Sequence, residues 1–262
     1  MGILYTTQQA VETSTSFTVR LSEGFRLQVD YLDTYLVRIA VVPDGGLEVD
    51  RTWMIAPEGE VPLEGRDRLS TDSFASSRGS ESRMRVSLVD ADGPLRLKVE
   101  QRVGDGWVHV FQDRANGAWQ WLGKRGLLKH FQALGGSEAH YGLGDTSGAL
   151  DRTGRRVRCL QSDALGYDAE RSDPLYKHAP WLIVSDDQSA AGLLYDTMAE
   201  TVFDLGAEHS NYFERFRHVE MSEKGRVLYV LAGPMLADVV SHLHRLTGMP
   251  AMPPRHALGF GF

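Results

Sequence analysis

The chain has 262 residues, enough for one large domain or two small ones. Hydrophobic residues make up 42% and charged residues 24% of the sequence, so it can build a full core and is not of the disordered class. The formal net charge of −7 argues against nucleic acid and against an anionic membrane surface as partners.

Cys159 is the only cysteine, which excludes a disulfide framework and a cysteine-based zinc site. The first sixteen residues lack a basic segment followed by a long apolar run, and no stretch approaches the roughly 20 apolar residues of a membrane span. We therefore expect a cytoplasmic protein that does not insert into membranes.

Strand signals dominate the first half of the chain. Residues 16–22 and 24–43 carry alternating or continuous β-branched and aromatic residues, and the turn cluster Pro43-Asp44-Gly45-Gly46 ends them. Residues 82–111 predict three strands separated by two turn clusters. The intervening segment 69–83 is rich in serine and predicts a surface loop. Turn signals every 8–12 residues or so are typical of an all-β sandwich or barrel.

The second half adds further strands and one helix. Residues 179–185 and 190–196 predict a hairpin around Asp186-Asp187, and residues 225–233 predict a strongly apolar strand. The segment 122–134 fits a helix or a strand. After Pro234, apolar residues recur on one helical face, and Gly248 stands where a helix C-terminus is expected; the apolar positions are Leu236, Val239, Val240, Leu243 and Leu246.

The nine histidines do not have the spacing of metal ligands, so we predict neither a metal nor any other cofactor. His242 and His244 lie two residues apart on the predicted helix and diverge by about 200°. The motif YGLGD at 141–145 lacks the third glycine and the Lys-Ser/Thr pair of phosphate-binding loops. We interpret it as a tight turn that needs a positive φ at Gly142 or Gly144.

Residues 161–180 mix carboxylates with aromatic rings, namely Asp163, Asp168, Glu170 and Asp173 with Tyr167 and Tyr176. Carboxylates accept hydrogen bonds from sugar hydroxyls and aromatic faces stack on C–H patches, so this composition suits a carbohydrate. A solvated loop is the simpler explanation of this composition. No pair of carboxylates stands out as the two catalytic groups of a glycosidase, and we predict no catalytic residue in this chain.

Several segments resemble the N-terminal region of glycoside hydrolase family 31, the α-glucosidase and α-xylosidase group. They are HYGLGD (140–145), SDALGYDAERSDPLYKHAPWLIV (162–184), AGLLYDT (191–197) and YVLAGPMLADVVSHLHRLTGMPAMPPRHALGF (229–260), with weaker similarity at 52–70. The resemblance implies a large β-sandwich of the galactose-mutarotase-like kind over residues 1–250. It also implies that residues 251–262 are a linker and the start of the first strand of a (β/α)₈ catalytic barrel.

The resemblance further implies that catalysis belongs to a different domain of the enzyme. The family's catalytic carboxylates belong to the barrel, so this chain is expected to be inactive alone, supporting the barrel and rimming the pocket for an α-glucoside or related sugar. Asp163 matches a position at which relatives contact the sugar, and Leu165 and Tyr167 are candidates for the rim. The sequence departs from the family pattern at two positions: Asp145 replaces the usual glutamate, and His256 stands where tryptophan is frequent. The identity of the sugar therefore stays open.

Two alternatives remain at this point. The first is a free-standing carbohydrate-binding or protein-interaction sandwich. The second is a mutarotase-like epimerase, which requires a histidine and a carboxylate acting as acid and base across a sugar. No histidine in the sequence can be matched to that role.

Overall fold

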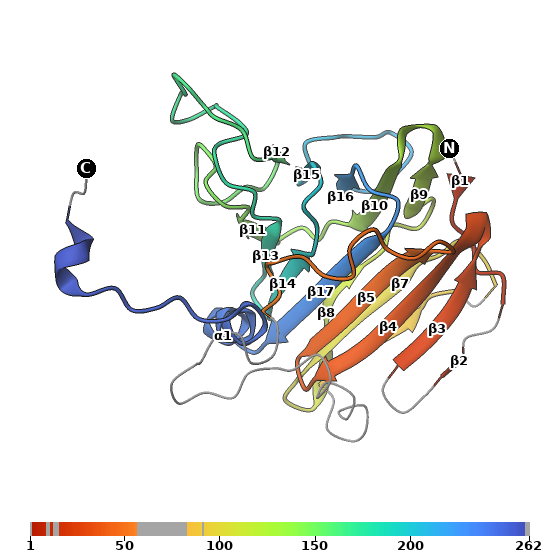
Figure 1. The fold of residues 1–262 in the computed structure, drawn as a ribbon. Coiled ribbons are helices and arrows are strands. Elements are labelled where there is room, and N and C mark those ends of the chain that lie inside the picture. Colours follow the sequence, from red (N-terminus) through yellow and green to blue (C-terminus); the bar gives the residue numbers. More distant parts are fainter. Residues whose placement is uncertain (1, 9–10, 13–15, 57–82, 91, 260–262) are drawn as a thin grey trace.

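The computed structural model describes residues 2–8, 11–12, 16–56, 83–90 and 92–259. Their strands form three antiparallel sheets, and one α-helix lies near the C-terminus (Figure 1). This confirms the predicted class, a mainly β fold with a C-terminal helix. The predicted loop at 69–83 lies, apart from Arg83, outside the described residues.

The largest sheet has eight strands. In spatial order they are β11 (Ala139–Gly142), β13 (Trp181–Ser185), β14 (Ala190–Tyr195), β17 (Arg226–Gly233), β5 (Leu36–Pro43), β4 (Phe25–Asp33), β3 (Ser16–Leu21) and β2 (Val11–Glu12). The second sheet has six strands: β1 (Gly2–Ile3), β9 (Trp119–Leu122), β10 (Leu127–Ala133), β16 (Phe216–Met221), β15 (Thr201–Asp204) and β12 (Arg156–Cys159). The third has three strands: β6 (Met84–Leu88), β7 (Leu97–Val103) and β8 (Gly106–Gln112).

The main core lies between the sheets and takes residues from all three of them. Along β4 the inward positions are apolar and buried while the intervening polar ones are half-buried, the two-residue alternation of a strand with one face on a core. By contrast, β17 is buried at every position, because its second face is also covered.

That second face carries a smaller core under helix α1 (Leu236–Thr247). Val239 and Leu246 of the helix are buried there against residues of β5, β14 and β17, and Ile55 completes the cluster. The Met235 N–H donates to the Asp238 carboxylate at the helix start. Gly248 ends the helix with φ of +89°, as its position in the sequence predicted.

The ambiguous segment 122–134 is a strand hairpin. β9 and β10 are joined by a single 3₁₀ turn, Gly123–Arg125, followed by Gly126 with φ of +60°. β10 also pairs with β16 over six residues, from Leu128 opposite Met221 to Ala133 opposite Phe216. Pairing with β16, which is distant in the sequence, makes this segment a strand rather than a helix.

After the helix the chain runs away from the sheets (Figure 1). Arg255–Leu258 form an exposed 3₁₀ helix; a further one, Ser22–Gly24, precedes β4. The short helix Arg255–Leu258 lies within residues 251–262, which we expected to be a linker and the start of a barrel strand. Phe260–Phe262 lie outside the described residues, so the predicted entry into a barrel strand stays a prediction.

Candidate functional site

The predicted site residues stand on the connection between β12 and β13, residues 160–180. In Figure 1 this connection and the one before β12 project from the sheets on the side toward which the C-terminal segment also extends. The long connection is irregular, without strands or helices of its own. Its conformation therefore depends on side chains and on neighbouring loops.

Two arginines hold the base of these loops. Arg152 is buried and donates to the carbonyl oxygens of Thr146, Ser147 and Ala149. Arg155 donates to the same Ser147 carbonyl at 2.5 Å. The loop before β12 is thus wrapped around guanidinium groups that satisfy its carbonyls.

The connection 160–180 is tied to this base and to itself. The Ser147 hydroxyl donates to the Ser172 carbonyl at 2.7 Å, and the Gly148 N–H donates to the Ala169 carbonyl at 3.0 Å. Asp168 accepts the N–H groups of Glu170 and Arg171, which closes a local turn. The loop therefore has a defined shape despite its exposure.

The other carboxylates of the connection differ in their contacts. Asp173 accepts the Arg158 N–H at 2.6 Å, and burial raises the pKa of its carboxyl group. Asp163 is exposed, and no hydrogen bond or ion pair from the described residues reaches its carboxylate. A carboxylate of this kind keeps its acceptor oxygens available for a ligand hydroxyl.

The two predicted rim residues flank a turn next to Asp163. Leu165 is 90% exposed and Tyr167 is 55% exposed, on either side of Gly166 with φ of +66°. The Tyr176 hydroxyl donates to the Ala164 carbonyl at 3.2 Å, which brings a second exposed aromatic ring to the same stretch. The structure thus gathers one free carboxylate and three exposed apolar or aromatic side chains, of which Tyr176 was not among the predicted site residues.

The YGLGD motif forms the tight turn expected from its glycines. Gly142, Leu143 and Gly144 all have positive φ, and a Cβ atom on Gly142 would stand 2.4 Å from the Trp181 carbonyl oxygen. Asp145 pairs with Lys177 at 2.9 Å. The turn therefore supports the far end of the 160–180 connection.

Three histidines pair with carboxylates inside the sheets. His130 lies 2.7 Å from Asp113 and stacks on Trp119, and burial lowers the pKa of its imidazole. His140 approaches Glu138, and His218 approaches Glu220. All three imidazoles are fully buried, so a sugar cannot reach them to exchange a proton. This disfavours the mutarotase-like alternative.

A cavity of about 250 Å³ opens elsewhere, between β8, β10 and the turn from β13 to β14. Phe111, Glu138 and Asp186 are among its lining residues, none of which comes from the 160–180 connection. It offers acceptor oxygens beside an aromatic ring, but is separate from the predicted site.

Sequence reasoning missed one further group. Asp204, Glu208 and His218 bring potential ligand atoms within 4.8 Å of one another. Asp204 and His218 are paired residues of neighbouring strands, and nothing in their spacing along the chain indicates this pairing. The only available signal was their residue types.

Comparisons with known proteins agree with the fold. The family model described as the glycosyl hydrolase 31 N-terminal galactose mutarotase-like domain matches residues 26–204. A GH31 dextranase from Flavobacterium johnsoniae in complex with isomaltotriose superimposes with a TM-score of 0.78 at 20% identity, covering 99% of this chain and 30% of the dextranase. A glucosidase II alpha subunit gives a TM-score of 0.68 at 14% identity, covering 95% and 34%.

Two curated relatives are also similar in sequence. Alpha-glucosidase 2 of Bacillus thermoamyloliquefaciens is 30% identical over 132 residues, half of this chain. An alpha-glucosidase of Saccharolobus solfataricus is 33% identical over 119 residues, 45% of this chain. In each case the match covers only 16% of the relative. The family model spans well over half of the residues of this chain. The chain therefore belongs to the galactose-mutarotase-like N-terminal domains of glycosyl hydrolase family 31.

Proposed function

We propose that this chain is the non-catalytic front domain of an α-glycosidase, most simply an α-glucosidase, which supports the catalytic barrel and rims its substrate pocket. Its similarity to two α-glucosidases, each matched over only 16% of its length, supports a role as one part of a larger enzyme. The parent enzyme would hydrolyse O-glycosyl bonds of an α-glucoside with a carboxylate pair located in the barrel.

The observation that carries the proposal is the unpaired Asp163 carboxylate on a tethered loop, beside exposed Leu165 and Tyr167. In the full-length enzyme, Asp163 would accept a hydrogen bond from a sugar hydroxyl while Leu165 and Tyr167 line the rim. Such a carboxylate would act in binding and positioning and would take no part in bond cleavage.

The test replaces Asp163 by alanine in the full-length enzyme. A hydrogen bond between a charged group and a hydroxyl is worth about 1.5–3 kcal/mol, so kcat/KM for an α-glucoside substrate should fall by roughly 10- to 150-fold. Glu170→Ala is the matched control, because Glu170 is an exposed carboxylate of the same loop, and it should leave kcat/KM unchanged. An unchanged kcat/KM in Asp163→Ala contradicts the contact.

A second test concerns the chain alone. We expect no turnover of an aryl α-glucoside by residues 1–262, and turnover in a sensitive assay would overturn the non-catalytic assignment. The alternative of a free-standing carbohydrate-binding module predicts that glucose, xylose or maltose binds the isolated chain tightly, with the cavity beside Phe111 as the first place to look. Absence of binding favours the supporting role.

Location follows the same reasoning. No helix among the described residues has the length and apolar character needed to cross a bilayer. We include a cytoplasmic location in the proposal, supported by the single cysteine, Cys159, which is buried and unpaired. Fractionation of the producing cells tests it, and recovery of the native enzyme outside the cytoplasm would contradict it.

A further inference from the structure

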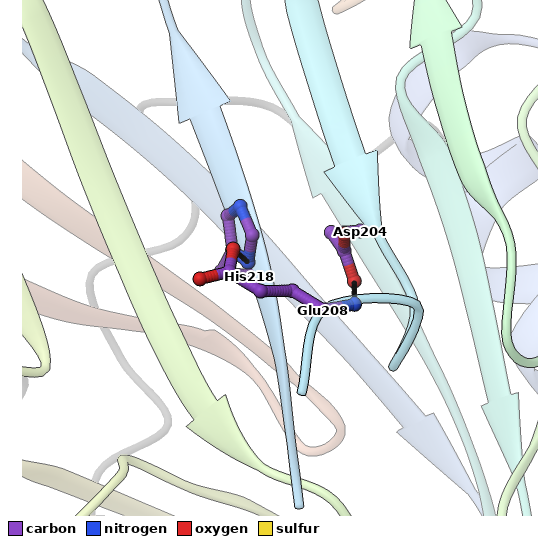
Figure 2. A group of neighbouring side chains, drawn as sticks. All are labelled: Asp204, Glu208 and His218. Atoms are coloured by element: carbon purple, nitrogen blue, oxygen red, sulfur yellow. Dashed lines mark hydrogen bonds and ion pairs between the residues drawn. The ribbon is translucent and has the colours of Figure 1, made fainter. Parts of the chain in front are cut away.

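Asp204, Glu208 and His218 form a cluster at one end of the six-stranded sheet (Figure 2). Asp204 ends β15 and lies opposite His218 of β16 in the antiparallel register. Glu208 lies in the turn after β15, and Gly206 in the same turn has a positive φ of +94°. The turn thus brings a third side chain back to a pair that the strands already place together.

The turn also orients Asp204. Its Oδ1 atom accepts the N–H groups of Gly206, Ala207 and Glu208 at 3.1, 2.8 and 3.1 Å. These bonds fix the carboxylate, and no hydrogen bond from the described residues uses its second oxygen. That oxygen is available as a ligand atom.

His218 supplies the observation that points to a cation. Its side chain is fully buried, and its Nε2 atom lies 3.1 Å from the Glu220 carboxylate, which can only accept a hydrogen bond. The Nε2 atom therefore carries the proton, and in a neutral imidazole Nδ1 then presents a lone pair. Nδ1 is buried without a hydrogen-bond partner, and it faces Glu208 Oε2 at 3.8 Å.

A lone pair that faces carboxylate oxygens is an unfavourable arrangement, which either a second proton on the imidazole or a cation bound at Nδ1 relieves. Metal-bound histidines usually donate their other ring nitrogen to a carboxylate, as His218 does to Glu220. Lys129 holds that carboxylate in place through an ion pair of 2.5 Å. The surroundings of His218 are therefore those of an oriented metal ligand.

The spacing of His218 Nδ1 and Glu208 Oε2 suits an ion of moderate size. At metal–ligand distances of about 2.0–2.2 Å, two ligand atoms of one ion lie roughly 2.8–4.4 Å apart. The 3.8 Å between His218 Nδ1 and Glu208 Oε2 falls within this range, and the half-exposed Glu208 side chain can adjust. Arg114 interacts electrostatically with Glu208, but its guanidinium already donates to the carbonyls of Asn116 and Gly117.

We propose that Asp204, Glu208 and His218 bind one divalent transition-metal ion of the Zn²⁺ class, with Glu220 positioning the histidine. One imidazole nitrogen with two carboxylates suits zinc, whereas magnesium and calcium prefer oxygen ligands alone. The ion would join β15, its turn and β16, and the remaining coordination positions would open toward solvent beside Glu208. The site is separate from the 160–180 connection and does not depend on the proposed function.

The test measures Zn²⁺ binding to the chain after treatment with a chelator and dialysis. We expect one Zn²⁺ per chain by calorimetry and a large shift of the His218 Nδ1 resonance in long-range ¹H–¹⁵N spectra. Glu208→Gln should weaken binding by about tenfold or more, because an amide oxygen is a poorer ligand than a carboxylate. Because the Glu208 side chain is half-exposed, this variant should fold as the original chain does, and an unchanged circular dichroism spectrum checks this.

Two controls separate this site from surface binding. Glu214→Gln removes an exposed carboxylate from the connection between β15 and β16 and should bind Zn²⁺ as the original chain does. His209→Gln removes the exposed histidine next to Glu208 and should also leave the affinity unchanged. The proposal is overturned if Glu208→Gln and Glu214→Gln have equal affinity, if His209→Gln abolishes binding, or if Zn²⁺ leaves the His218 resonance unmoved.

Discussion

At the scale of single residues, the fold depends on buried polar groups that form hydrogen bonds with one another. Arg217 is almost fully buried, donates to Gln132 at 2.8 Å and pairs with Glu138. It also donates to His140 Nε2 at 3.2 Å, so His140 Nδ1 carries the proton and donates to Thr153 at 2.8 Å. The neutral imidazole fits this network, whereas a protonated one would lose its acceptor nitrogen and place a positive charge against the Arg217 guanidinium.

This arrangement predicts a pH dependence of stability. Burial and then Arg217 lower the pKa of His140 to about 3, with Asp151 opposing them. Because the unfolded histidine has a pKa of about 6.5, the unfolded chain binds more protons below that pH, and stability is lost as the pH falls from about 6.5 toward 3. Between pH 6.5 and 4.5 the titration of His140 should lower the free energy of unfolding by about 2 kcal/mol.

The measurement is the free energy of urea unfolding at pH 6.5 and 4.5 in the original chain and in His140→Gln. The loss of stability between the two pH values should be smaller in the variant by that amount. His109→Gln, which removes an exposed histidine, should behave as the original chain does. Equal pH dependence in all three proteins would show that His140 does not titrate as argued.

At the scale of elements, helix α1 turns an exposed sheet face into a second core. Leu246 is buried under it beside Ile55, and the Leu246 carbonyl accepts the Ala56 N–H at 3.2 Å. The helix therefore also positions the segment that leads out of the eight-stranded sheet. In the proposed full-length enzyme, the same helix would connect the sandwich to the barrel.

A pair of leucine substitutions on this helix tests the second core. Leu246→Ala should lower the free energy of unfolding by about 2–5 kcal/mol, because it leaves a cavity in a packed cluster. Leu236→Ala changes the same chemistry at the first helical position, which is 45% exposed, and should cost less than about 1 kcal/mol. Equal losses in urea unfolding would mean that the helix does not pack on the sheet as described.

At the scale of the whole molecule, one core joins all three sheets. Phe17 and Val29 of the eight-stranded sheet, Leu128 and Val219 of the six-stranded sheet, and Val99 of the three-stranded sheet belong to a single buried cluster. No sheet can lose its packing without exposing residues of the others. The sandwich should therefore unfold as one cooperative unit.

Calorimetry tests this cooperativity. We expect a single thermal transition whose calorimetric and van't Hoff enthalpies agree, with a heat-capacity change of about 3–4 kcal/mol/K for a chain of this size. Two resolved transitions would contradict the continuous core and would indicate that one sheet unfolds independently.

Local patterns in the sequence were sufficient for many elements. Alternation along residues 25–33 predicted a strand, and the glycines of YGLGD predicted a tight turn. The apolar stripe after Pro234 predicted a helix. The structure confirms all three, because each pattern depends only on neighbours in the chain. The exposure of Asp163, Leu165 and Tyr167 agrees with a loop prediction, while their contact with a sugar stays a prediction. The composition of that loop indicated the chemistry, but its hydrogen bonds to Ser147 and Gly148 of the preceding loop were not foreseeable.

Sequence by itself determined the β class, the helix near the C-terminus and, through its motifs, the family. Only the tertiary structure decided which strands pair, as when β17 joins β5, which lies far from it in the sequence. It also decided whether 122–134 is strand or helix. It alone placed Asp204 opposite His218. The physical reason is that propensity and periodicity act between sequence neighbours, whereas pairing and register depend on burial shared by segments far apart in the chain.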